Sequence, residues 1–400
     1  MPVRLRSANR QLIRQINEAV ILGLIHDRGP IARNVIADAA NLSPATITGI
    51  TGVLIERGLV FESEAGASTG GRPPVMLEIN REAGCVAGVK LTESHIIAAL
   101  TDLGGDPLLH TSVPLETDRT AANVARQVSE IILDMRCQFP ERRFYGAGIG
   151  LAGAIDRRAG ICRFSPFLHW RVVPLRDLVE TGIGAPVVIE NDVSALTLAE
   201  RWFGHGAGLT DFIVVTLGRG VGLGMVFDGR LYRGGRGAGG EFGHLPMDPD
   251  GPLCDCGNRG CLEAIVSVPA VTRQIKTAFG SDLTLAAGVR LANEGDVDAI
   301  RIFATAGETL GRALAGIVNV LNPTRIIIGG EGVQTLAPVL APLRRALAAH
   351  CFEGLLHDLD LIVEPWGDEA WARGAAGLML DDLFHARLDR ESSVSSGAPK

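Results

Sequence analysis

Three cysteines and one histidine in the middle of the chain have the residue types and spacing that suit a metal ion. Cys254, Cys256 and Cys261 fall within eight residues, and His244 precedes the first of them by ten positions. Three thiolates and one imidazole can complete the tetrahedral shell of a structural zinc ion, and such a shell leaves no open position for catalysis. The sequence therefore predicts a structural zinc site held by these four side chains.

Disulfide bonds and isolated buried thiols are the alternatives to a metal site. The chain has seven cysteines, an odd number, and Arg14 and Glu18 interrupt its first apolar stretch, which is not typical of a secretory signal. No run reaches the roughly 18 apolar residues of a membrane span, so we expect a cytoplasmic protein without membrane contact. In a reducing cytoplasm, clustered cysteines indicate metal ligands. The scattered cysteines are expected in the core: Cys85, Cys137, Cys162 and Cys351.

Two carboxylates flank the predicted metal ligands closely. Glu241 lies three residues before His244, and Glu263 lies two residues after Cys261. Carboxylates accept hydrogen bonds from hydroxyl groups, and bonds to a charged acceptor are stronger than neutral ones. The pair therefore indicates polar clamps for a small hydroxylated ligand.

The composition is that of a globular α/β protein with more than one domain. The 400 residues are 46% hydrophobic, and 50 of them are glycines, which indicates many tight turns between strands. The net charge of -7 argues against a protein coated in positive charge. It leaves room for a small DNA-binding module, because residues 1–34 contain six arginines against two acidic residues.

The first eighty residues have the pattern of a winged helix-turn-helix. Apolar periodicity predicts a helix over 8–26, with Leu12, Ile16, Val20 and Leu24 on one stripe, and a second helix over 31–40. A third helix is expected over 44–57, with Ser43 as N-cap, Pro44 at the first position, and Gly58 at the end. Two strands, 59–62 and 75–79, would form the wing.

Several polar residues of this segment are candidates for DNA contacts. The third helix would enter the major groove, and its threonines are expected on the exposed face, while the rigid turn 70–74 would hold an arginine near the backbone. An interaction module that binds no DNA is the alternative. The candidate contacts to double-stranded DNA are Arg33, Ser43, Thr46, Thr48, Thr51 and Arg72.

The rest of the chain alternates strands with helices, which predicts mixed α/β lobes with functional residues at strand ends. Asn191 and Asp192 follow one such strand and begin a helix. Alternating glycines over 218–224 let a backbone approach a phosphate or sugar closely, although a structural turn explains them equally well. The expected strands cover 85–91, 95–100, 147–151, 186–190, 211–217, 225–227 and 325–328, and the expected helices cover 121–136, 193–202 and 369–384.

These motifs together resemble the ROK family, which groups bacterial repressors, open reading frames and sugar kinases. The resemblance spans residues 8–386, and the N-terminal segment with its Gly-Gly-Arg-Pro turn matches the family's regulators, including those for N-acetylglucosamine, glucose and xylose. It implies an α/β fold in which a winged helix-turn-helix precedes a two-lobed actin-like, sugar-kinase fold with a structural zinc site. The motifs that carry it are Glu241-x-Gly-His244, Cys254-x-Cys-Gly-x-x-Gly-Cys261-x-Glu263, Asn191-Asp192, Asn322-Pro323 and Gly329-Gly330.

The resemblance also implies a domain division. The DNA-binding domain would occupy residues 1–80, and the first α/β lobe would occupy 81–195, completed by the C-terminal helix 369–386. The second lobe, with the zinc site, would occupy 196–368, and residues 387–400, rich in serine, would form a disordered tail.

The family's functional residues carry over to matching positions of this chain. The sugar contacts correspond to Asn191, Asp192, Glu241, His244 and Glu263, with Asp192 at the position of the kinases' general base. The first helical turn also favours a carboxylate at Asp192 for electrostatic reasons alone. The zinc ligands correspond to His244, Cys254, Cys256 and Cys261.

The chain departs from the kinases where they hold ATP. An Asp-x-Gly-Gly-Thr loop cradles the phosphates in the kinases, and the corresponding stretch here is Lys90-Leu91-Thr92-Glu93-Ser94. Phosphoryl transfer depends on positioning and neutralising those phosphates, so we expect no enzymatic activity and only a vestigial role for Asp192. Arg219 is a further departure in the second glycine loop, and Phe167 stands where many members have an asparagine near the sugar, which leaves the effector open.

The sequence therefore predicts a sugar-responsive transcriptional regulator, most readily a repressor of genes for xylose, a related aldose or an amino sugar. A homodimer or tetramer would place two recognition helices on a palindromic operator. An ATP-dependent sugar kinase with a DNA-binding arm is one alternative, and a regulator controlled by a protein partner is another.

Overall fold

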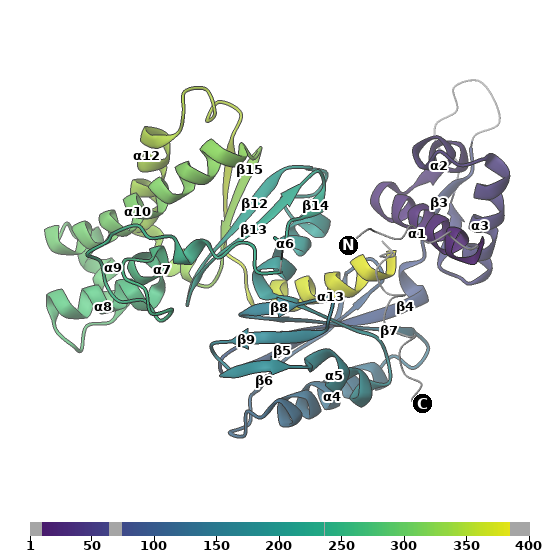
Figure 1. Cartoon of the computed structure of the whole chain (residues 1–400), viewed down its shortest axis with the longest axis horizontal. Helices are drawn as coiled ribbons and strands as arrows, with labels where there is room; N and C mark the ends of the chain where they lie inside the picture. Colours follow the sequence, from purple (N-terminus) through teal and green to yellow (C-terminus); the bar gives the residue numbers. More distant parts are fainter. Residues whose placement is uncertain (1–9, 64–73, 236, 385–400) are drawn as a thin grey trace, which may run out of the picture. The chain divides into compact units, whose positions relative to one another are not determined.

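A computed structural model describes residues 10–63, 74–235 and 237–384 of the chain (Figure 1). The described residues form two compact units. Unit 1 comprises the described residues of 10–151, 157–190 and 375–384, and unit 2 comprises those of 152–156 and 191–374. Within the described residues, no helix combines the length and the apolar character that crossing a membrane requires.

In unit 1, the described residues up to Asn80 form three helices and a small antiparallel sheet with the order β1-β3-β2. The Ser43 hydroxyl accepts the Thr46 amide at 3.2 Å, so the third helix begins as the sequence predicts. Gly58 follows this helix with φ 71°, which is a left-handed conformation that glycine adopts without strain. The elements are α1 (Arg10–Arg28), β1 (Ile31–Ala32), α2 (Arg33–Ala40), α3 (Pro44–Glu56), β2 (Val60–Ser63) and β3 (Met76–Ile79).

Two expectations about side-chain orientation in this segment are wrong. The buried face of α1 contains Ile21, Leu22 and Ile25, whereas Val20, placed on the apolar stripe from its spacing, is 43% exposed. Thr51, expected on the exposed face of α3, is completely buried. The apolar residues of both helices are numerous enough for more than one stripe, and tertiary packing decides which stripe is buried.

The α/β part of unit 1 is built on a five-stranded sheet with the order β11-β7-β4-β5-β6. Strand β4 pairs with β7 in parallel and with β5 antiparallel, and β5 pairs with β6 antiparallel. The elements are η1 (Arg81–Ala83), β4 (Gly84–Leu91), β5 (His95–Asp102), β6 (Pro107–Pro114), α4 (Ala121–Cys137), β7 (Arg143–Leu151), β9 (Ile161–Ser165), β10 (Trp170–Val173), α5 (Leu175–Ile183), β11 (Val187–Asn191) and α13 (Asp368–Phe384).

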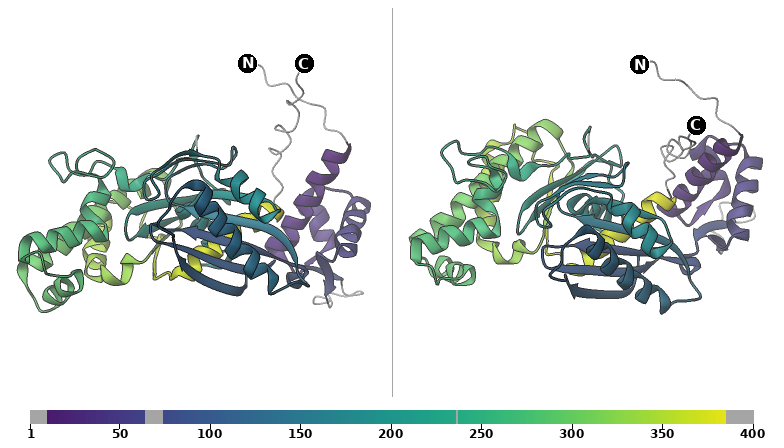
Figure 2. Two further views of the ribbon diagram at one scale, coloured as in Figure 1. Left: turned by 90° about the horizontal axis from the view of Figure 1, so that it is seen from below. Right: turned by 60° about the horizontal axis from the view of Figure 1, so that its bottom comes forward.

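Helices cover both faces of this sheet. Helices α4 and α5 lie on one face and the C-terminal half of α13 lies on the other (Figures 1 and 2). A Cβ atom added to Gly148 of β7 would lie 1.8 Å from the Ala375 carbonyl oxygen of α13. Glycine is therefore required at this position for the helix to pack so closely on the strand.

A buried charge cluster lies on the same side of unit 1. The guanidinium of Arg157, whose side chain is 8% exposed, lies 3.6 Å from the carboxylate of Glu190. It also lies 3.9 Å from Asp381 and 3.7 Å from Asp382, both on α13. All three carboxylates are buried or nearly so, and a buried carboxylate needs a nearby cation to offset its lost hydration. Arg157 therefore joins three separate segments of the chain.

Unit 2 contains a second five-stranded sheet, with the order β14-β13-β12-β15-β16. Strand β12 pairs with β13 antiparallel and with β15 in parallel. The elements are β8 (Ala154–Asp156), α6 (Asp192–Phe203), β12 (Phe212–Leu217), β13 (Val221–Phe227), β14 (Arg230–Leu231), η2 (Phe242–His244), α7 (Leu262–Val266), α8 (Val268–Phe279), α9 (Leu285–Asn293), α10 (Val297–Leu321), β15 (Arg325–Gly329), α11 (Gly332–Thr335), η3 (Ala337–Val339), α12 (Leu340–His350) and β16 (Asp360–Glu364).

The core of unit 2 lies between its sheet and the helix pair α10 and α12, which pack side by side (Figure 1). Cβ atoms added to Gly307 and Gly311 of α10 would lie 2.4 Å from backbone oxygens of η3 and α12, so these glycines allow the close crossing. Helix α6 lies on β13, where Gly224 faces Thr197. At the end of α6, Glu200 accepts the Trp366 indole N–H at 2.8 Å and the His205 amide at 2.8 Å.

The two sheets have the same topology. When the strands of each sheet are numbered along the chain, both sheets have the order 3-2-1-4-5. In both, the first three strands form an antiparallel meander, and the first and fourth strands pair in parallel. The chain therefore contains two copies of one α/β architecture, as the sequence predicts for this fold class.

Candidate functional site

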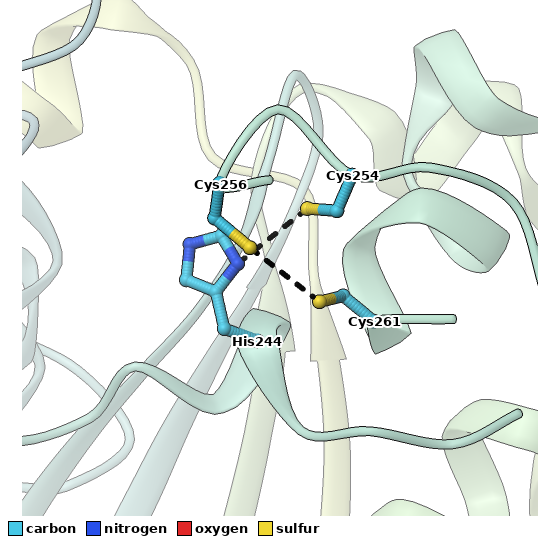
Figure 3. A group of neighbouring side chains, drawn as sticks. All are labelled: His244, Cys254, Cys256 and Cys261. Atoms are coloured by element: carbon cyan, nitrogen blue, oxygen red, sulfur yellow. Dashed lines mark hydrogen bonds between the residues drawn. The ribbon is translucent and has the colours of Figure 1, made fainter. Parts of the chain in front are cut away.

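The four predicted metal ligands converge in unit 2 (Figure 3). Their ligand atoms all lie within 4.8 Å of one another. The Cys254 Sγ lies 3.6 Å from the His244 Nδ1, and the Cys256 Sγ lies 3.6 Å from the Cys261 Sγ. A tetrahedral zinc ion with bonds of about 2.3 Å to sulfur and about 2.0 Å to nitrogen separates its ligand atoms by about 3.5–3.8 Å. The two 3.6 Å distances match this spacing, so the four side chains form a cluster that could hold a metal ion such as zinc.

The two nitrogens of the His244 ring face different partners. The Nδ1 atom faces the thiol of Cys254, and the Nε2 atom lies 3.8 Å from the Glu241 carboxylate. When Nδ1 binds a metal, Nε2 carries the proton and directs it towards an acceptor. This geometry is compatible with the two roles predicted for His244, because one ring nitrogen faces a thiol of the metal-ligand cluster and the other faces the exposed carboxylate of Glu241.

Backbone contacts position the cysteine-rich loop. The Cys254 amide donates to the Asn258 carbonyl at 2.8 Å, and isolated bridges join Leu253 to Arg259 and Pro246 to Cys261. A Cβ on Gly260 would lie 1.5 Å from the Asp248 carbonyl oxygen, so only glycine allows the loop to close on itself. The loop therefore brings ligands from both of its ends together.

The surroundings shift the pKa values of the three thiols in different directions. Burial raises the pKa of Cys261 to about 12, and it also raises the pKa of Cys254. The amide of Asn258, which donates to the exposed Cys256 sulfur, lowers the pKa of that thiol. Three crowded sulfur atoms of this kind need a divalent cation to exist together as thiolates, and a coordinated thiol is deprotonated outright.

The metal ligands connect directly to Glu263. Cys261 is the N-cap of α7, and Glu263 lies in the first turn of this helix. The Glu263 Oε2 accepts the Val221 amide at 2.9 Å, which fixes the carboxylate on the glycine loop between β12 and β13. Gly243, between Glu241 and His244, packs so closely that an added Cβ would lie 3.3 Å from Glu263. Glu241, His244 and Glu263 are thereby brought together.

Asn191 and Asp192 lie at the start of α6 in the same unit. The Asn191 Oδ1 accepts the amides of Val193 and Ser194 at 3.0 and 3.2 Å, and its amide group donates to the Gly153 carbonyl at 3.2 Å. Its side chain is therefore engaged in capping the helix. Asp192 occupies the first helical turn, where the backbone favours a carboxylate.

The start of α6 packs against the strand that follows the glycine loop. A Cβ on Gly222 of β13 would lie 2.5 Å from the Val193 side chain, and a Cβ on Gly224 would lie 1.7 Å from the Thr197 Oγ1. Gly222 follows Val221, whose amide binds Glu263. The residue after Asp192 thus packs on Gly222, and Glu263 binds the neighbouring Val221, so both carboxylates are positioned by the start of β13.

The candidate DNA contacts in the first eighty residues have different environments. Arg33 donates to the Glu62 carboxylate at 2.6 Å and to the Thr51 hydroxyl at 3.2 Å, and Thr51 is buried. Ser43 caps α3 and shares a hydrogen bond of 2.9 Å with the Thr46 hydroxyl. Thr48 is exposed. Arg33 and Thr51 thus hold this segment together, and Arg72 lies outside the described residues.

Two sets of hydrogen bonds were not predicted from the sequence. The first is Glu331, whose Oε1 accepts the Arg219 amide at 2.8 Å. The second is the turn after β4, where the Thr92 Oγ1 accepts the amides of Ser94 and His95 at 3.3 and 2.9 Å. For Glu331, the available signal was a glutamate inside the glycine-rich stretch Gly329-Gly330-Glu331-Gly332. For the turn after β4, the signal was the Thr-x-Ser spacing of Thr92 and Ser94.

The repeated strand order, together with carboxylates on a glycine loop beside a metal-ligand cluster, defines a protein with a sugar-kinase-like fold. A model of the ROK family matches residues 86–382. The chain belongs to the ROK family, as its motifs predicted.

Similar proteins include regulators of this family. The xylose repressor of Bacillus subtilis (strain 168) is 30% identical over 383 residues, which cover 94% of this chain and 98% of that protein. The DNA-binding transcriptional dual regulator NagC of Escherichia coli (strain K12) is 32% identical over 365 residues, covering 88% of this chain and 90% of that protein.

Solved structures of the family resemble the chain to different extents. A ROK family transcriptional regulator, described as a homolog of the E. coli MLC protein, has a TM-score of 0.83 and 28% identity, and the match covers 93% of this chain and 97% of that one. A ROK family glucokinase from Streptomyces griseus, solved with glucose and AMPPNP, has a TM-score of 0.60 and 31% identity, and covers 74% of this chain and 99% of that one.

Proposed function

We propose that the chain is a sugar-responsive transcriptional repressor. The observation that carries this proposal is the extent of the likeness: relatives named as repressors are matched over 94% of this chain and 98% of their own length. The family model begins only at residue 86, and the glucokinase match covers 74% of this chain. The likeness to the repressors covers 94% of the chain, so it includes most of the N-terminal segment. A regulator needs this segment, and a kinase does not.

The N-terminal segment is the proposed DNA-binding arm. Its three helices and three-stranded sheet have the composition of a winged helix-turn-helix, with α3 as the recognition helix. Ser43, Thr46 and exposed Thr48 would contact the operator, with Arg72 from the wing. A homodimer or tetramer would supply two such arms to a palindromic site.

The sugar effector would bind on the face of unit 2 that carries Asn191, Asp192, Glu241, His244 and Glu263. Three of these side chains are carboxylates, which accept hydrogen bonds from adjacent hydroxyl groups of a sugar. The zinc ion would be structural, because its four protein ligands leave no open position. It would hold the Glu241 and Glu263 segments in register. Of the candidate effectors, we favour xylose or a related aldose.

A sugar kinase is the less favoured alternative. Between β4 and β5 the Thr92 hydroxyl closes the turn through its hydrogen bonds. Lys90 stands where the kinases of the family have an aspartate, and Thr92 and Glu93 stand where they have a pair of glycines. A carboxylate at this turn would repel phosphate. We therefore propose that the chain lacks kinase activity, and that Asp192 retains only its contact with the sugar.

The sugar site can be tested by calorimetry on the full-length protein with xylose, glucose and N-acetylglucosamine. We expect one of these sugars to bind, and Glu263→Gln to weaken its binding at least tenfold, because a charged acceptor is lost. Glu308→Gln, an exposed glutamate on α10, is the matched control and should bind as the wild type does. Sugar-dependent ADP release in a coupled assay would instead support the kinase.

The DNA-binding arm requires a separate experiment. We expect a footprint on the DNA upstream of neighbouring sugar-metabolism genes, and a change in its affinity by roughly 5–150-fold when the sugar is added. Thr48→Glu should abolish the footprint through repulsion by phosphates, whereas Thr305→Glu on the exposed face of α10 should retain it. A protein that binds no operator with or without sugar would contradict the proposal.

We further propose that the domain division expected from the sequence describes the working parts of a cytoplasmic protein. Residues 1–80 would bind DNA, 81–195 and 369–386 would form the first lobe, and 196–368 the second. Limited proteolysis that releases a fragment of about the first eighty residues, still able to dimerise or bind DNA weakly, would support these boundaries.

A further inference from the structure

The glycine loop between β12 and β13 donates two backbone amides to two carboxylates. Gly218 closes the turn by donating to the Gly220 carbonyl at 3.0 Å. The Arg219 amide donates to Glu331 at 2.8 Å, and the Val221 amide donates to Glu263 at 2.9 Å. Glu263 belongs to the proposed sugar site, whereas no role has been assigned to Glu331. The two amides are separated by one residue, so the loop binds two carboxylates side by side.

Three glycines create the space that Glu331 occupies. A Cβ on Gly218 would lie 2.2 Å from the Glu331 Oε1 and 2.5 Å from its Oε2, so any larger residue would displace the carboxylate. Cβ atoms on Gly330 and Gly332 would lie 2.6 and 2.8 Å from the Leu217 carbonyl oxygen. The glycines on both sides of Glu331 therefore let its backbone approach the end of β12. The carboxylate then lies directly over the loop.

A turn of this kind is an anion-binding element. Backbone amides that point outward from a glycine-rich turn form a concave site for phosphate and similar groups, and hydrogen bonds from amides to a charged acceptor are the stronger kind. Here the anion is supplied by the chain itself. Because Glu331 is tethered two residues from β15, its effective concentration at the loop is far above that of any dissolved anion. Its charge also repels a second anion.

We propose that Glu331 is an internal anion that occupies the phosphate-binding amide of the loop Gly218–Val221 and so excludes nucleotide polyphosphates from unit 2. Glu263 remains available to a neutral sugar on the adjacent amide. Glu331 is therefore a residue that determines the specificity of the loop. This inference rests on the proposed function, because the exclusion of nucleotides explains how a sugar-kinase-like fold responds to sugar alone. The Glu331 side chain is exposed, so its removal opens the amide directly to solvent.

The test measures binding of tripolyphosphate and of MgADP to the full-length protein by calorimetry. Glu331→Ala should bind tripolyphosphate at least about tenfold more tightly than the wild type, because one amide is freed and one repulsive charge is lost. Glu331→Gln, which keeps the size of the side chain and one acceptor oxygen, should show a smaller gain. Glu308→Ala is the matched control, since it removes one exposed glutamate of the same unit.

The outcomes separate a specific site from a general effect of charge. The proposal is supported when Glu331→Ala gains affinity for both probes and Glu308→Ala does not. It is overturned when the two variants gain equally, or when neither differs from the wild type. If Glu331→Ala is unstable, Glu331→Gln takes its place in the comparison, and circular dichroism tests whether this variant keeps the fold. Failure of the proposed function would appear as a wild-type protein that binds neither sugar nor operator. Polyphosphate binding is measured without sugar or operator, so the two failures are distinguishable.

Discussion

Replacement of Cys256 by serine tests the predicted metal site without disturbing the core. Cys256 is exposed, whereas Cys254 and Cys261 are 5% and 1% exposed and pack together with Ala264. A serine at either buried position would place a hydroxyl in an apolar cluster and combine two effects. At position 256 the hydroxyl meets solvent, so the loss of a metal ligand is the main consequence.

The expected magnitude follows from the number of ligands. Structural zinc sites contribute roughly 10–16 kcal/mol in zinc-finger peptides at neutral pH. Divided evenly among four ligands, this gives about 2.5–4 kcal/mol for one thiolate, or roughly two to three powers of ten in zinc affinity. Because the metal binds the folded chain, the free energy of unfolding in saturating zinc should fall by a comparable amount.

The assay is competition for zinc with a chromophoric chelator, followed by thermal unfolding with and without zinc. We expect about one zinc ion per wild-type chain, and weaker retention together with a lower unfolding temperature for Cys256→Ser. Sugar affinity should also fall, because Cys261 caps the helix that carries Glu263. Cys137→Ser is the matched control, since Cys137 is an exposed cysteine on α4 in the other unit. Its expected place in the core was wrong, because it is the last residue of α4 and its side chain reaches solvent. Equal zinc affinity and equal unfolding temperatures for Cys256→Ser and the wild type would refute the reasoning.

Three further predictions test the packing and electrostatics of the fold. Arg157→Met should destabilise the chain by roughly 3–5 kcal/mol in urea unfolding, because three neighbouring buried carboxylates lose their cation; a loss below about 1 kcal/mol would contradict this. Gly224→Ala should lower the free energy of unfolding by about 1–3 kcal/mol, because the added methyl group displaces α6. In a double-mutant cycle, Thr197→Ala should relieve part of this loss, and additive effects of the two substitutions would argue against the contact. Burial raises the pKa of the Glu200 carboxyl above its ordinary value of 4.5. The folded state therefore binds the carboxyl proton more tightly than the unfolded state does, and the wild type loses stability as pH rises from 4.5 through the raised pKa. Glu200→Gln lacks this dependence, so its unfolding temperature relative to the wild type should rise over the same pH range, and a constant difference would exclude Glu200 as the source.

Features that depend on neighbouring residues were predictable from the sequence. Ser43, Pro44 and Gly58 define the ends of α3 through local capping, which acts within one helical turn. The predicted zinc ligands lie within eighteen consecutive residues, and a short loop brings them together. The family and its fold class also followed from motifs of this local kind, and the match to residues 86–382 confirms them.

Only the tertiary structure decided which side chains meet across long separations. Thr51 was expected to be exposed because it is a small polar residue, and packing that includes a hydrogen bond from Arg33 buries it. The Glu331 carboxylate reaches the Arg219 amide across 112 residues of sequence, and Glu263 reaches Val221 across 42. No local pattern encodes such contacts, because they require two strands and a helix to be in register. The sequence by itself determined the ligands, caps and family of this protein, and the fold decided which carboxylates lie on the glycine loop, because backbone amides bind whichever acceptor packing brings within reach.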